Sequence, residues 1–146
     1  VYHFGSRESL MQQVLSTERE RQQTEIAQYL ASGLGPIEIL RAYFHDRTEP
    51  EQRSTLRFFF DLVAEANRNP QTYGAFLSGE AVEYWFSVAA QLTDKPSFSP
   101  QQRTLFSLAL GAARGLYIEL LSTGDLAHVR SSYDRLLEWI GDAWSD

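Results

Sequence analysis

The sequence contains no cysteine, which excludes disulfide bonds, thiol catalysis and cysteine-ligated metal sites. That absence is compatible with a reducing compartment, and we expect a cytoplasmic protein. No apolar run approaches the roughly 18 residues of a membrane-spanning helix, so we expect no membrane partner. Basic residues are the minority, because 13 Lys and Arg stand against 19 Asp and Glu, a formal net charge of -6. This acidic balance argues against the chain itself wrapping nucleic acid.

The sequence motifs of common enzyme sites are also absent. There is no G-x-S-x-G, P-loop, H-E-x-x-H or G-x-G-x-x-G. A di-iron bundle needs Glu-x-x-His pairs, and none of the three histidines follows a glutamate by three positions. Glu80 and Glu83 form a lone Glu-x-x-Glu that fits a solvated helix face better than a metal site. We therefore predict that the chain is not an enzyme and holds no cofactor and no metal.

A helical pattern runs through almost the whole chain. Of its 146 residues 43% are hydrophobic and 13% aromatic, which suits one globular domain with a sizeable core. Apolar residues recur at helical spacing, and no run alternates as a strand would. Capping residues, glycines and prolines divide the pattern into about six helices. We expect one from Arg7 to about Ser32, one from Pro36, one ending near Asn67, one over about Gln71 to Leu92, one from Pro100 to about Thr123, and one after Asp125. The fold class is all-α.

The first of these helices has apolar ends and a polar middle. Its middle, residues 16–25 (STERERQQTE), contains no apolar residue. A helix that is polar all round usually bridges between packed bodies. We therefore expect its two ends to dock on different parts of the molecule.

Aromatic side chains gather on three successive helices in the middle of the chain. Aromatics at helical spacing usually fill a core, yet bulky rigid rings also pack imperfectly and leave apolar cavities for small molecules. The two interpretations are compatible. The glycines Gly111 and Gly115 lie on one face of the same predicted helix. A glycine inside a helix lowers helix stability by about 1 kcal/mol relative to alanine, unless close packing against another helix recovers that loss. Packing within the chain or against a second copy would explain the pair.

The opening stretch YHFGSRESL resembles the junction between the recognition helix and the fourth helix of the tetracycline-repressor (TetR) family. The matching residues are Tyr2, His3, Phe4, Gly5, Ser6, Arg7, Glu8 and Leu10. Ala113-Arg114-Gly115-Leu116, continuing to Gly124-Asp125, is similar to the family's eighth helix and the turn after it. The resemblance implies that residues 1–5 end a helix-turn-helix domain whose remainder precedes Val1. It also implies that residues 6–146 form an effector-binding and dimerisation domain.

The resemblance further implies a transcriptional regulator, most simply a repressor that a small hydrophobic or aromatic effector releases from operator DNA. The missing N-terminal helices would read the operator, while Tyr2, His3 and Arg7 contact phosphates. We expect the effector-binding pocket to be lined by Phe59, Phe60, Val63, Tyr84, Trp85 and Phe106, with Arg114 or Tyr117 as polar anchors. We expect a homodimer through the last two helices, with Ala109, Ala112, Gly115, Leu116, Tyr133, Leu136, Leu137 and Ile140 at the seam. The alternative is a stand-alone helical small-molecule carrier or interaction module without DNA binding.

Overall fold

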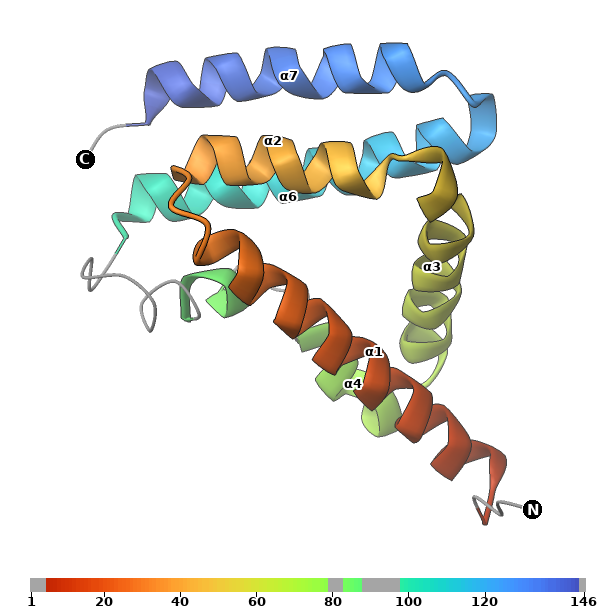
Figure 1. Cartoon of the computed structure of the whole chain (residues 1–146). Coiled ribbons are helices and arrows are strands. Elements are labelled where there is room, and N and C mark those ends of the chain that lie inside the picture. The colour runs from red at the N-terminus through yellow and green to blue at the C-terminus, as the bar shows by residue number, and fades with distance from the viewer. Residues whose placement is uncertain (1–4, 79–82, 88–97, 145–146) are drawn as a thin grey trace.

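The computed structural model describes residues 5–78, 83–87 and 98–144. These residues are overwhelmingly helical and none of them forms a strand, which confirms the all-α class. Residues 83–87 are helical as well, and the remainder of the helix predicted over about Gln71 to Leu92 lies partly outside the described residues. The other elements, drawn in Figure 1, are α1 (Arg7–Leu30), α2 (Pro36–Arg47), the 3-10 turn η1 (Pro50–Gln52), α3 (Arg53–Arg68), α4 (Pro70–Ser78), α6 (Pro100–Thr123) and α7 (Leu126–Ala143).

Local hydrogen bonds explain where the helices begin and end. The Ser6 hydroxyl accepts a hydrogen bond from the Ser9 amide at 3.0 Å and caps α1. Ser99 and Gln102 form a capping box at the start of α6, with bonds of 3.1 and 3.0 Å. Gly124 ends α6 in the left-handed region at φ 72°, which glycine adopts without steric cost. Asp125 caps α7 through the His128 amide. These boundaries are confirmed, although α1 ends at Leu30 rather than near Ser32.

The helices form a layer and a diagonal brace (Figure 1). Helices α2, α6 and α7 pack against one another, α3 contacts α6, and α4 contacts both α3 and α1. Helix α1 runs obliquely from the N-terminal end of α2 towards α4 and the N-terminus. Helix α6 is apolar and long enough, by composition alone, to cross a membrane, with a mean hydropathy of 1.3. The central helix of a packed core passes the same test, and the neighbours of α6 are α2, α3 and α7.

The described core has two separate hydrophobic clusters, and α1 contributes to both. Ile26 belongs to the larger cluster, built mainly on α2, α6 and α7. Leu15 belongs to a smaller cluster with Leu62, Ala66, Tyr73 and Phe76 of α3 and α4. The expectation that the two ends of α1 dock on different bodies is therefore confirmed. Its polar middle is not a solvated bridge, however, because Glu18 and Gln22 are buried at 8% and 6% exposure.

Candidate functional site

A cavity of about 60 Å³ lies where α1, α2, α3 and α6 meet the helical residues 83–87. Its apolar lining is made of Ile26, Leu56, Phe59, Trp85, Leu110 and Ala113. Its polar lining is made of Arg19, Gln22, Tyr43, Arg47, Arg114 and Tyr117. The cavity therefore has both apolar and cationic walls, and none of these described lining residues is acidic.

Trp85 forms a rigid part of the apolar wall. Its ring meets the Tyr43 ring edge-on, with centroids 5.1 Å apart. Behind Trp85, the Phe106 ring lies at 5.5 Å. Such edge-to-face and tilted contacts hold aromatic rings in defined orientations. The wall is therefore shaped by rings that are themselves fixed by neighbours.

Arg19 and Gln22 form the part of the wall that α1 provides. The Arg19 guanidinium donates a hydrogen bond to the Gln22 amide oxygen at 2.7 Å and another to the Phe76 carbonyl. It also lies over the Phe76 ring, 4.6 Å from the centroid. Because Arg19, Gln22 and Ile26 follow one another at intervals of three and four, they share one face of α1. That face closes the cavity.

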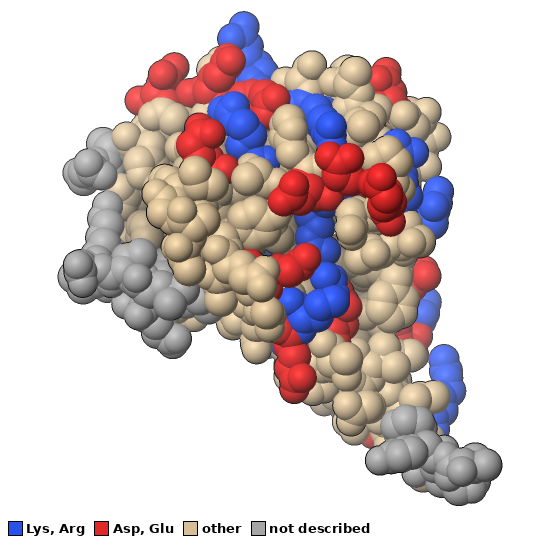
Figure 2. Space-filling view, viewed as in Figure 1, with Lys and Arg blue, Asp and Glu red and all other residues tan. Residues whose placement is uncertain are grey.

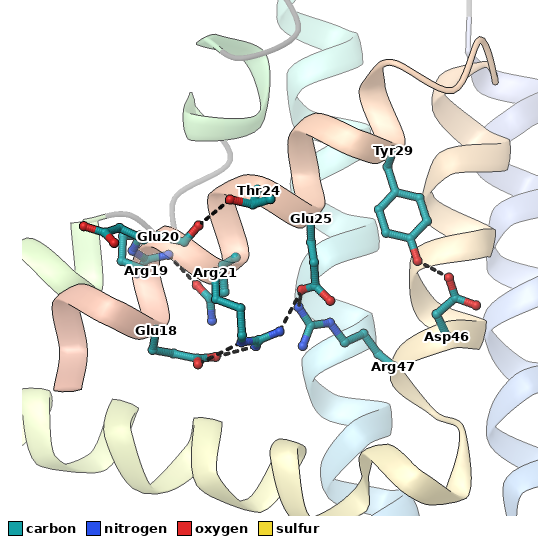
Figure 3. A network of polar contacts seen from close by, with 10 residues as sticks. Glu18, Arg19, Glu20, Arg21, Thr24, Glu25, Tyr29, Asp46 and Arg47 are labelled. Atoms are coloured by element: carbon teal, nitrogen blue, oxygen red, sulfur yellow. Dashed lines mark hydrogen bonds and ion pairs between the residues drawn. The ribbon is translucent and has the colours of Figure 1, made fainter.

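A chain of charged contacts fastens the middle of α1 to α2 (Figure 3). Arg21 donates to Glu18 at 2.9 Å and to Glu25 at 3.0 Å, and Glu25 also accepts from Arg47 of α2. One turn further along α1, the Tyr29 hydroxyl donates to Asp46 of α2. Acidic and basic side chains are interspersed over the middle of the molecular face shown in Figure 2. The polar middle of α1 is thus a docking surface.

Arg47 remains a cation despite being largely buried. Burial lowers the pKa of its guanidinium, but the nearby Tyr43 and Glu25 raise that pKa above its ordinary value. The guanidinium also lies over the Tyr43 ring, 4.9 Å from the centroid. Arg47 therefore brings a permanent positive charge to the cavity wall.

Tyr117 of α6 is another residue of the cavity lining, and its hydroxyl is buried and neutral. The side chain is 6% exposed, and its ring is stacked on Phe44 with centroids 5.3 Å apart. Among the described residues, none makes a hydrogen bond to the buried hydroxyl. Burial raises the pKa of Tyr117 well above the usual tyrosine value. The group therefore stays protonated and remains available to donate a hydrogen bond.

Alkaline pH is expected to unfold the protein partly through its buried tyrosines. Burial raises the pKa of Tyr117 and of Tyr133 in the folded chain, so the neutral forms favour folding. Their contribution is complete below the unfolded tyrosine pKa of about 10 and is lost as pH rises above it. Urea unfolding measured from about pH 9 to pH 11 should show stability falling. The Tyr117→Phe variant should lose less stability than the original protein over that pH interval. An equal loss of stability in the two proteins would contradict the raised pKa of Tyr117.

The structure brings half of the predicted effector residues to the cavity. Phe59, Trp85, Arg114 and Tyr117 line it. The other four do not line this cavity and pack in or beside the core. Phe106 lies behind Trp85, Phe60 and Tyr84 pack on the larger cluster, and Val63 packs on the smaller one. The prediction did not include the polar residues of α1 and α2, namely Arg19, Gln22, Tyr43 and Arg47. The spacing of Arg19, Gln22 and Ile26 places these three on one face of α1, but local sequence does not show that this face is buried.

The residues of the predicted dimer seam differ in their burial within the single chain. Four of its residues lie in the chain's own core at 3% exposure or less, namely Ala109, Tyr133, Leu137 and Ile140. The other four retain exposed surface, namely Ala112, Gly115, Leu116 and Leu136. A shallow groove between α6 and α7 is lined by Thr104, Ser107, Leu108, Gly111, Ala112 and Leu136. Nearby Leu108, Ile118 and Trp139 are 59%, 54% and 62% exposed.

Of the predicted phosphate-contacting residues, Tyr2 and His3 lie outside the described residues. The Arg7 side chain is 84% exposed at the first position of α1, and its guanidinium lies 3.6 Å from the Glu65 carboxylate.

Comparison with models of known families, with curated proteins and with solved structures returned no match to this chain.

Proposed function

We propose that this chain is the effector-binding and dimerisation part of a ligand-responsive transcriptional regulator of the tetracycline-repressor type. The observation that carries the proposal is the course of α1. The helix begins at Arg7, beside the stretch that resembles the end of a helix-turn-helix, and Arg19, Gln22 and Ile26 of the same helix line the cavity. One rigid element therefore joins the proposed DNA-binding end to the proposed effector site.

The length of α1 supports its use as a lever. The helix has 24 residues. At 1.5 Å per residue it is about 36 Å long, so a pivot of about 5° displaces one end by about 3 Å relative to the other. A ligand that enters the cavity contacts α1 directly and favours one of its orientations. In a dimer, a change in the orientation of α1 in both copies changes the distance between their two recognition helices. That distance must match two DNA half-sites about one helical turn apart.

The exposed face of α6 supports a homodimer. A Cβ built on Gly111 or on Gly115 meets no atom within 4 Å, so packing within the described chain does not account for either glycine. Each glycine costs about 1 kcal/mol relative to alanine in a helix interior. Close approach of a second copy recovers that cost, and it also covers the exposed Leu108 and Trp139. Paired α6 and α7 helices would then form a symmetric four-helix bundle.

Selection from random-sequence duplex DNA tests the regulatory proposal. The protein should be extended at its N-terminus by the residues encoded before Val1 and taken through repeated rounds of binding. We expect enrichment of a palindromic site, as a two-fold symmetric dimer requires. The chain from Val1 to Asp146, with a net charge of -6, is the control and should enrich nothing. Failure of the extended protein to enrich any site would favour the carrier module instead.

Arg7→Ala in the extended protein is expected to weaken binding to the selected site and to random DNA by about the same factor. Arg7 lies at the exposed N-terminus of α1, where free amides and the helix dipole favour an anion such as phosphate. Phosphate contacts position a protein on DNA without reading sequence. Equilibrium binding to both DNAs at one salt concentration measures the two factors. A loss confined to the selected site would contradict this role.

A further inference from the structure

We infer that the cavity is a hydration site, in which at least one buried water molecule joins α1, α2 and α6 through hydrogen bonds to Gln22, Arg47 and Tyr117. This site belongs to the folded chain itself and does not depend on the proposed regulator. Three features support it: the volume of the cavity, the polar side chains around it and the buried hydroxyl of Tyr117.

The volume and the lining of the cavity suit water. The cavity measures about 60 Å³, whereas a single water molecule needs roughly 10–15 Å³ of such space. Apolar cavities stay dry, because a water molecule inside them finds no hydrogen-bond partner. Here six of the twelve described lining residues carry polar side chains. The space is therefore large enough and polar enough to hold water.

The Tyr117 hydroxyl is the polar group that most needs a partner. It is buried, and none of the described residues makes a hydrogen bond to it. A buried hydroxyl without a hydrogen bond destabilises a folded chain, because the same group is hydrogen-bonded to water when the chain is unfolded. Buried water molecules in proteins typically bond to polar groups of this kind.

The electrostatic neighbours of this hydroxyl place it on the cavity side of α6. Tyr43, Arg47 and Arg114 interact with it, and all three line the cavity. Arg47 in turn interacts electrostatically with both Tyr43 and Tyr117. The face of the Tyr117 ring is covered by Phe44, so the hydroxyl end of the side chain is the part that can reach a water molecule. Water in the cavity therefore lies within reach of the hydroxyl.

Gln22 and Arg47 complete the set of hydrogen-bond partners. A water molecule accepts hydrogen bonds from the Tyr117 hydroxyl and from the Arg47 guanidinium, which has five N–H groups to donate. The water donates to the Gln22 amide oxygen, which accepts one bond from Arg19 and has a second lone pair. Buried waters make about three hydrogen bonds on average, and this set supplies three. One water molecule thus links three helices.

Crystallography of the chain, with and without xenon under pressure, tests the site directly. We expect electron density for water within hydrogen-bond distance of the Tyr117 Oη atom, and no xenon in the cavity. Xenon enters dry apolar cavities, so its binding here would show that the space is dry. Xenon in the cavity, a cavity without water density, or a direct bond from Tyr117 Oη to a protein group would each overturn the inference.

The sign of the stability change in Tyr117→Phe gives an independent test at neutral pH. With water in place the substitution breaks a hydrogen bond, so the urea midpoint should fall. Removing an unpaired buried hydroxyl would instead raise the midpoint. Tyr84→Phe is the control, because it removes a hydroxyl from a half-buried position outside the cavity lining and should lower the midpoint less. A midpoint in Tyr117→Phe that rises, stays unchanged or falls only as far as in Tyr84→Phe would overturn the inference.

Discussion

Replacing Phe44 with alanine is expected to lower the free energy of unfolding by about 3–5 kcal/mol. The ring is fully buried on α2, and it stacks on Tyr133 of α7 with centroids 4.0 Å apart and on Tyr117 of α6 at 5.3 Å. Its removal leaves a void where three helices meet. Because domains of this kind are stable by only about 5–15 kcal/mol in total, the variant should be close to unfolding.

Urea denaturation followed by circular dichroism measures this loss. Phe58→Ala on α3 is the matched control, since the same atoms are removed from a side chain that is 43% exposed. Surface substitutions usually change stability by about 0.5 kcal/mol or less. A similar cost at both positions would mean that the stack of Phe44, Tyr117 and Tyr133 is not central to the core.

Gly115→Leu is expected to convert the proposed dimer into a folded monomer. In the single chain a side chain at this position meets no atom within 4 Å, so leucine fits the helix and improves its propensity by up to about 1 kcal/mol. In the dimer the same side chain would occupy the space of the partner helix. The variant should therefore have half the mass of the original protein in sedimentation equilibrium and keep its helical circular dichroism spectrum.

Gln71→Leu controls for the added leucine, because it places the same side chain on an exposed position of α4. This variant should remain dimeric. Trp139 provides a second measurement, since it is 62% exposed in the single chain and should become accessible to acrylamide quenching in Gly115→Leu. A monomer before substitution, or a dimer after it, would contradict the proposed seam.

Helix ends were predictable because their causes are local. Ser6, the Ser99–Gln102 box and Asp125 each bond to a backbone or side-chain group three residues away, within the range that a sequence pattern covers. The face of α6 that packs in the chain's own core was harder to predict, because α6 is apolar on more than one face. Periodicity groups Ala109 with Ala113, and Gly111 with Gly115, but it does not say which face turns to the chain's own core.

Only four of the twelve residues that line the cavity belong to the predicted set, for a similar reason. Phe59 and Trp85 stand out as bulky aromatics, so a hydrophobic wall was foreseeable. Arg19 and Gln22 belong to a stretch without apolar residues, and such a stretch is ordinarily solvated. Their burial depends on partners that lie far along the chain, such as the Phe76 carbonyl, 57 residues from Arg19. Long-range contacts of this kind leave no mark in local composition.

The two hydrophobic clusters give the molecule two unequal cooperative units. Among the described residues, five buried side chains form the smaller cluster and seventeen the larger one. Local opening costs less where fewer apolar contacts are lost. Amide hydrogens of α4 and of the first turns of α1 should therefore exchange with solvent faster than those of α6 and α7. An opening confined to the smaller cluster would release the N-terminal half of α1, while Ile26 and the Arg47–Glu25 pair still hold the other half on α2.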